Sequence, residues 1–130
     1  MSITVEYSSQ VPDWRLLAPG VFPVHALMLM AEGKKKLGTV AENNAAKERF
    51  YKAFDTYNTA SLKKMAAIWS KDYNVNQVNA STNPLLLVGN GPFRIQSAVA
   101  NGAVTMVRNT RYNSGPKVKA LQRVVFKVIG

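Results

Sequence analysis

The chain has 130 residues and a mass of 14.3 kDa, long enough for one buried core and too short for two, which excludes a two-domain protein. Its 47% hydrophobic and 18% charged residues exclude a disordered chain, and the absence of cysteine excludes disulfides, thiolate metal sites and a cysteine nucleophile. The formal net charge is +10, and residues 73–130 contain seven basic and no acidic side chains, so an anionic partner is indicated.

Residues 1–39 are expected to form an N-terminal arm with one short helix. Alternating side chains over Ile3–Tyr7 are typical of a short strand or an extended arm. A proline-rich loop carrying Trp14 follows, and the apolar run Val24–Glu32 predicts a short buried helix that ends at Gly33.

The same region bears on location. Val24–Ala31, the longest apolar run considered as a span, is far shorter than a bilayer-crossing helix needs. The first residues have no basic region followed by an apolar core, so no signal peptide is predicted and an intracellular location is favoured.

Residues 40–130 are expected to form a single α+β domain that begins with two amphipathic helices. The first runs for about four turns from Glu42 to Tyr57, and the second follows a turn at Asn58, capped by Thr59 or Ser61. Apolar side chains recur at helical spacing in both: Ala46, Phe50, Ala53 and Phe54, then Leu62, Met65, Ala66 and Trp69. The two helices are expected to form a hairpin.

The second half of this domain is expected to be mainly strand. A modest strand is predicted around Val75 and Val78, and a two-turn helix over Phe93–Asn101. Strands over Val104–Tyr112 and Val118–Ile129 then flank a turn. The fold class is therefore α+β, with N-terminal helices packed on a curved, cone-like antiparallel sheet and an extended N-terminal arm.

Alternation in the last strand separates an apolar face from a basic one. Val124 and Phe126 share the apolar face, and Arg123 and Lys127 share the other. With Phe126 on the covered side, Tyr112 is the expected exposed aromatic residue of this region.

Three motifs follow one another between residues 46 and 100: Phe50-Tyr51-x-Ala53, Leu62-x-x-Met65-x-x-Ile68-Trp69-x-x-Asp72 and Pro84-x-x-Leu87-Val88-Gly89. Their order resembles the nuclear transport factor two-like superfamily, especially its SnoaL-like branch. The resemblance implies a conical α+β barrel, commonly dimeric, whose pocket binds small hydrophobic ligands, performs catalysis or serves in docking. It places Tyr57, Trp69 and Asp72 near that pocket.

The resemblance also raises a question about the sheet. Members of the superfamily usually have three or more long strands after the short helix, whereas this chain has two predicted ones. Either Ile3–Tyr7 completes the sheet or the sheet keeps an open edge for a partner.

Catalytic groups are scarce. Beyond Asp72 there is no Asp, Glu or His, which excludes a carboxylate base on the late strands, and Asp72 itself is expected to cap a turn. His25 is the single histidine and is expected in a core or interface, so no metal site and no cofactor are predicted. We expect a protein that is not an enzyme.

The basic half supplies the predicted binding residues. These are Arg108, Arg111, Lys117, Lys119, Arg123 and Lys127. A field of this sign attracts acidic proteins, nucleic acid and lipid headgroups alike.

The predicted docking residues are Trp14, Phe22 and Leu27. Trp14 lies on the proline-rich arm, and the stretch from Phe22 to Met30 is more apolar than one short helix needs. We expect a basic binding or assembly subunit that docks on an acidic protein within a larger complex. A nucleic-acid-binding protein that uses the basic sheet face, a SnoaL-like enzyme or carrier, and a homo-oligomer are the alternatives.

Overall fold

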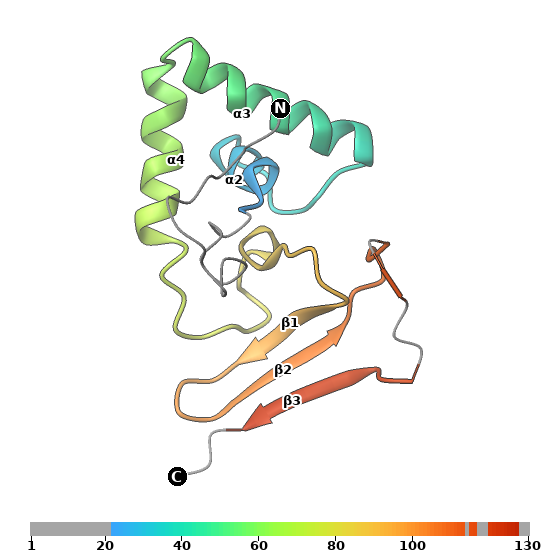
Figure 1. Cartoon of the computed structure of the whole chain (residues 1–130). Helices are drawn as coiled ribbons and strands as arrows, with labels where there is room; N and C mark the ends of the chain where they lie inside the picture. The colour runs from blue at the N-terminus through green and yellow to red at the C-terminus, as the bar shows by residue number, and fades with distance from the viewer. Residues whose placement is uncertain (1–21, 114, 117–119, 128–130) are drawn as a thin grey trace, which may run out of the picture.

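A computed structural model describes residues 22–113, 115–116 and 120–127 (Figure 1). Its elements are α2 (Val24–Ala31), α3 (Val40–Asp55), α4 (Thr59–Lys71), the 3-10 helix η1 (Pro84–Leu87), β1 (Phe93–Ala98), β2 (Ala103–Arg108) and β3 (Arg123–Lys127). Helices precede an antiparallel sheet, which confirms the α+β class. The predicted strand over Ile3–Tyr7 lies outside the described residues.

Local signals explain where the helices begin. Thr39 Oγ1 accepts a hydrogen bond from Glu42 N at 3.2 Å, and Thr39 N donates to Glu42 Oε2 at 2.6 Å. This capping box starts α3 at Val40, two residues before the predicted start. Asn58, and not Thr59 or Ser61, caps α4, because its Oδ1 accepts from Ser61 N at 3.1 Å.

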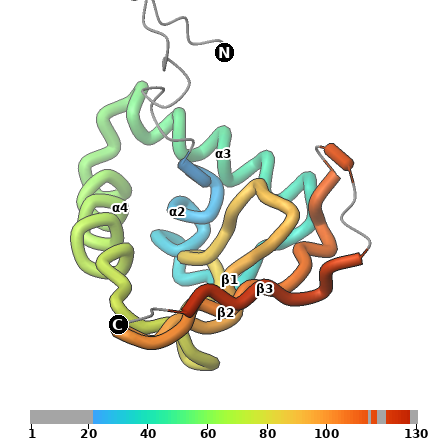
Figure 2. Tube along the Cα trace, turned by 60° about the horizontal axis from the view of Figure 1, so that its bottom comes forward, coloured from blue at the N-terminus to red at the C-terminus, as the bar shows by residue number. Residues whose placement is uncertain are grey.

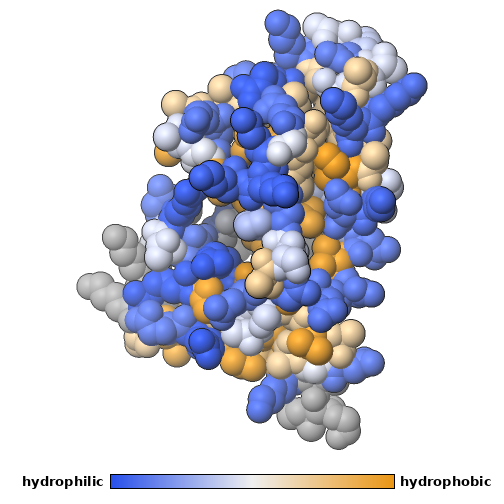
Figure 3. All heavy atoms as spheres, turned by 180° about the vertical axis from the view of Figure 1, so that it is seen from behind, coloured by the Kyte–Doolittle hydropathy of each residue, from blue (hydrophilic) through white to orange (hydrophobic). Residues whose placement is uncertain are grey.

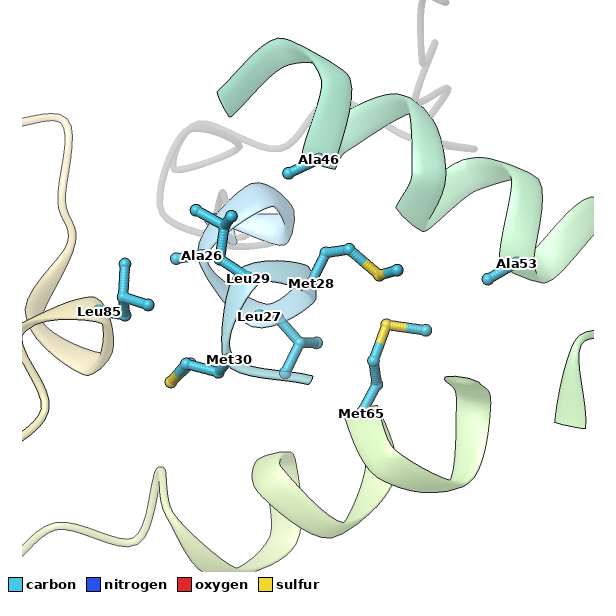
Figure 4. Packing of buried hydrophobic residues seen from close by; sticks show 9 residues of the cluster. All are labelled: Ala26, Leu27, Met28, Leu29, Met30, Ala46, Ala53, Met65 and Leu85. Carbon is cyan, nitrogen blue, oxygen red and sulfur yellow. The ribbon is translucent and has the colours of Figure 1, made fainter. Parts of the chain in front are cut away.

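Helix α2 is the centre of the core. Five consecutive residues of this helix are buried, so it is apolar on all sides, as a helix enclosed by others must be. It lies in the corner between α3 and α4 in both views (Figures 1 and 2). These two helices join at that corner through the predicted turn at Asn58. The buried cluster in Figure 4 consists of Ala26, Leu27, Met28, Leu29, Met30, Ala46, Ala53, Met65 and Leu85. The expected boundary between residues 39 and 40 therefore falls at the start of α3, between two helices that share one core.

The sheet has the order β1-β2-β3, with antiparallel neighbours. The helix predicted over Phe93–Asn101 is wrong, because Phe93–Ala98 pairs with β2 as β1. The register shifts between Ile95 and Ser97, and this irregularity interrupts the alternation that marks a strand. The strand predicted around Val78 is also wrong, since Val78 forms a single bridge with Ala98.

The sheet is thinly covered. It lies beside η1, at the lower end of the molecule in Figure 1, and no described residue of its strands is buried. Phe126, expected on a covered face, is 60% exposed, whereas Tyr112 is half-buried. The space-filling view from behind shows apolar surface mixed with polar side chains at the lower end of the molecule (Figure 3).

Candidate functional site

A basic hollow lies between η1, the loop after α2, strand β1 and the loop after β2. Its volume is about 340 Å³. It is lined by Lys36, Leu37, Pro84, Leu85, Leu87, Val88, Gly89, Arg94, Ile95, Asn109, Thr110 and Arg111. We call this depression the basic hollow.

Three cations surround the basic hollow. Lys36 follows α2, Arg94 lies on β1, and Arg111 lies in the loop after β2. All three residues are exposed. The described lining residues include no Asp, Glu or His. Charges of one sign around a concave surface focus the electrostatic potential there, so the hollow attracts anions.

Asn109 holds one wall of the hollow in place. Its Nδ2 donates to the carbonyl oxygen of Gly91 at 2.9 Å, and its backbone N donates to that of Pro92 at 2.8 Å. Its Oδ1 accepts from Arg111 N at 3.1 Å. These bonds tie the loop after β2 to the turn before β1, which keeps Arg111 on the same side as Arg94.

The floor of the hollow is aliphatic. Leu85 is fully buried and reaches both the floor and the helical core, while Leu37, Leu87 and Ile95 are half-buried. Asn83 Oδ1 accepts from Leu85 N at 3.0 Å, so Asn83 caps η1, which begins at Pro84, one residue before Leu85. A ligand that fits here carries negative charge opposite the three cations and places an apolar group on the aliphatic floor.

A second depression, the aromatic pocket, lies beside α4. Its volume is about 550 Å³, and its lining residues are Phe22, Pro23, Trp69, Tyr73, Asn74, Leu86 and Val88. The ring centroid of Phe22 is 4.6 Å from that of Trp69 and 5.1 Å from that of Tyr73, both edge-on, an arrangement that stabilises aromatic pairs.

Tyr73 is the polar group of this aromatic cluster. Its hydroxyl is buried and has no hydrogen-bond partner among the described residues. Burial raises the pKa of Tyr73 to about 12, because the phenolate form loses hydration.

The described members of the predicted anion-binding set are divided between the basic hollow and the sheet. Arg111 lines the basic hollow, Arg108 is half-buried at the end of β2, and Arg123 and Lys127 lie on β3. Lys117 and Lys119 lie outside the described residues. Sequence reasoning missed Lys36 and Arg94 as site residues, since no pattern in the chain indicates that these two segments approach Arg111.

The docking and pocket predictions need two corrections. Leu27 is 6% exposed and packed in the core, so its side chain is covered by this chain and offers no docking surface. Tyr57 and Asp72 are exposed and line neither depression, whereas Trp69, at 55% exposed, lines the aromatic pocket together with Phe22. Trp14 lies outside the described residues.

The described part of the chain contains no cluster of three or more potential metal ligands. None of its helices combines the length and apolar character that crossing a membrane requires.

No family model, curated protein or solved structure matches the chain. The likeness to the nuclear transport factor two-like superfamily stays a prediction.

Proposed function

We propose that this chain is a non-enzymatic binding and assembly subunit that docks on an acidic protein partner through the basic hollow. The observation that carries the proposal is the convergence of Lys36, Arg94 and Arg111 around an aliphatic floor. Arg guanidinium groups bind carboxylates in a paired geometry that lysine cannot reproduce, so Arg94 and Arg111 are the expected carboxylate contacts.

The lining favours a protein over a nucleic acid. Proteins that bind single strands stack bases on aromatic rings, and the described lining of the hollow contains no aromatic side chain. Leu37, Leu87 and Ile95 instead offer contacts to aliphatic side chains. An acidic segment with neighbouring apolar residues matches both the charge and the floor.

The test compares binding of a defined probe by two double variants. The probe is a synthetic peptide of alternating Glu and Pro, which supplies carboxylates and apolar rings but lacks the run of backbone N–H groups that a strand needs. An oligonucleotide of equal charge serves as competitor. Arg94→Glu with Arg111→Glu is expected to weaken peptide binding by about tenfold or more, because each lost charge contact in a partly desolvated site contributes about 1 kcal/mol.

The matched control is Lys63→Glu with Lys64→Glu, which changes the net charge equally on the exposed surface of α4. This control should retain most of the peptide affinity. Equal losses in the two double variants would show that net charge alone drives binding, and the proposal would fail. Preference for the oligonucleotide would favour the nucleic-acid alternative.

A small-molecule carrier is the second candidate, and the unpartnered hydroxyl of Tyr73 favours it. After a shift of the side chains that cover this hydroxyl, an apolar ligand with one hydrogen-bonding group would satisfy it from the aromatic pocket that Tyr73 lines. In a Trp14→Phe background Trp69 is the sole tryptophan and reports on the pocket. Acetylnaphthalene should quench its fluorescence at lower concentration than naphthalene, and Tyr73→Phe should abolish the difference. Equal quenching by the two probes would remove this candidate.

A further inference from the structure

Among the described residues, strand β3 is an edge of the sheet. It pairs with β2 on one side, and no described strand pairs with its other side. An edge strand presents backbone N–H and C=O groups in positions where a further strand could pair with them. Proteins either block such an edge or use it for binding.

The pairing with β2 shows which backbone groups are available. Arg108 N donates to the carbonyl oxygen of Gln122 at 3.2 Å, so the backbone of Gln122 points toward β2. In an antiparallel strand alternate residues point their N–H and C=O groups to the same side. Arg123, Val125 and Lys127 therefore point these groups away from β2, toward the open edge.

The same alternation distributes the side chains. Arg123, Val125 and Lys127 share one face of the sheet, and all three are exposed. Val124 and Phe126 share the other face, where Phe126 is largely exposed. The edge thus carries a cation at each end of one face and apolar side chains on the opposite face.

A second copy of the chain fits this edge poorly. Antiparallel pairing centred on Val125 would set Arg123 of each copy opposite Lys127 of the other, and parallel pairing in register would set each cation opposite itself. Like charges directly opposite each other destabilise a strand pair. A strand with carboxylates at these positions would instead be stabilised.

We propose that β3 accepts an extended segment of the acidic partner as the next strand of the sheet. This segment carries acidic side chains opposite Arg123 and Lys127 and apolar side chains opposite Val124 and Phe126. The pattern acidic, apolar, any, apolar, acidic reads the same in both directions, so it suits parallel and antiparallel addition. The inference rests on the proposed function for the charge of the partner and adds the conformation in which that partner binds.

The test uses a blocked synthetic peptide with the core Glu-Val-Thr-Val-Glu, titrated into the full-length chain and followed by backbone amide NMR. Val125→Pro removes an outward N–H and leaves the bonds to β2 in place, since proline is tolerated on strand edges. Val125→Thr keeps that N–H and is the matched control. The proline variant should bind the peptide about tenfold more weakly, and Val125→Thr should bind it as the parent chain does.

Two controls separate this inference from the proposed function. A peptide with Lys in place of Glu should not bind. Arg94→Glu with Arg111→Glu should leave binding of the strand peptide unchanged, because these residues line the hollow and not β3.

Three outcomes would overturn the inference. Equal binding by the parent and Val125→Pro would show that the edge is not the site. If Arg94→Glu with Arg111→Glu abolished binding of the strand peptide while Val125→Pro did not, the acidic partner would bind in the hollow without strand addition. A dimer in sedimentation that Val125→Pro dissociates would assign the edge to a second copy.

Discussion

The guanidinium of Arg49 holds the carboxylate of Glu32 through two hydrogen bonds, from Nε to Oε1 at 2.6 Å and from Nη2 to Oε2 at 2.8 Å. The pair joins the middle of α3 to the residue that follows α2. This bond raises the pKa of the Arg49 guanidinium above its ordinary value. It fixes α2, which supplies most of the buried cluster, against the longer helix α3.

Glu32→Gln should lower the free energy of unfolding by about 0.5 to 1 kcal/mol. The ion pair of Glu32 with Arg49 has two hydrogen bonds, but it remains exposed to water, which limits its contribution. The loss should shrink in high salt, which screens an exposed pair. Urea unfolding of the parent, Glu32→Gln, Arg49→Gln and the double variant isolates the interaction. Additive losses in this double-mutant cycle would contradict a direct contribution of the pair.

Leu85 connects the sheet side of the molecule to the helical core. It is fully buried and is the one described η1 residue in the buried cluster. Leu85→Ala should cost about 2 to 5 kcal/mol, the range for a leucine truncated in a packed core. Leu87→Ala, a half-buried neighbour in the hollow, should cost clearly less. Equal losses in thermal unfolding would show that η1 does not anchor through Leu85.

The helices were predictable because their signals are local. Apolar side chains at helical spacing predicted α3 and α4, and the compact run with Gly33 behind it predicted α2; Gly33 indeed has a φ of +76°. Strand β1 was missed because the shift in register between Ile95 and Ser97 breaks the alternation that identifies strands. The sequence thus indicated the class of the fold but not every element.

The candidate site was less predictable than the fold. Its cations come from three segments far apart in the chain, and the hydrogen bonds of Asn109 that set Arg111 in place are tertiary contacts. Leu27 had the composition of a docking residue, yet α2 is enclosed on all sides. Composition led to the prediction of an acidic partner, whereas the candidate contact residues could be located only from the packing of the chain.

His25 makes the stability of the fold dependent on pH. Burial, followed by the positive charge of Lys47, holds the pKa of His25 below its ordinary value of 6.5. Below pH 6.5 the unfolded chain therefore protonates His25 more readily than the folded chain does. The free energy of unfolding is not reduced by His25 above pH 6.5, and it falls as the pH drops through that value.

His25→Gln should reduce the difference between melting temperatures measured at pH 7.5 and at about pH 5.5. Lys47→Gln should reduce it by a smaller amount, because desolvation is the larger cause. A pH dependence identical in the parent and His25→Gln would assign the acid sensitivity to other groups.

Tyr73→Phe should stabilise the chain, an outcome opposite to that of most core substitutions. The variant keeps the ring that contacts Phe22 and Trp69 and removes a hydroxyl that is buried without a hydrogen-bond partner among the described residues. Removing such a group should raise the free energy of unfolding by about 1 kcal/mol. Chemical denaturation near neutral pH measures the change, and Tyr57→Phe, at an exposed position, should have no effect.

The same variant should change the response to alkali. Because the folded pKa of Tyr73 is raised from 10 to about 12, the parent is most stable below pH 10 and loses stability as the pH rises from 10 toward 12. Tyr73→Phe should lack this part of the alkaline loss, whereas Tyr57→Phe should keep it. A destabilised Tyr73→Phe would show instead that the hydroxyl has a partner in the folded chain, and would remove the observation that favours a small-molecule carrier.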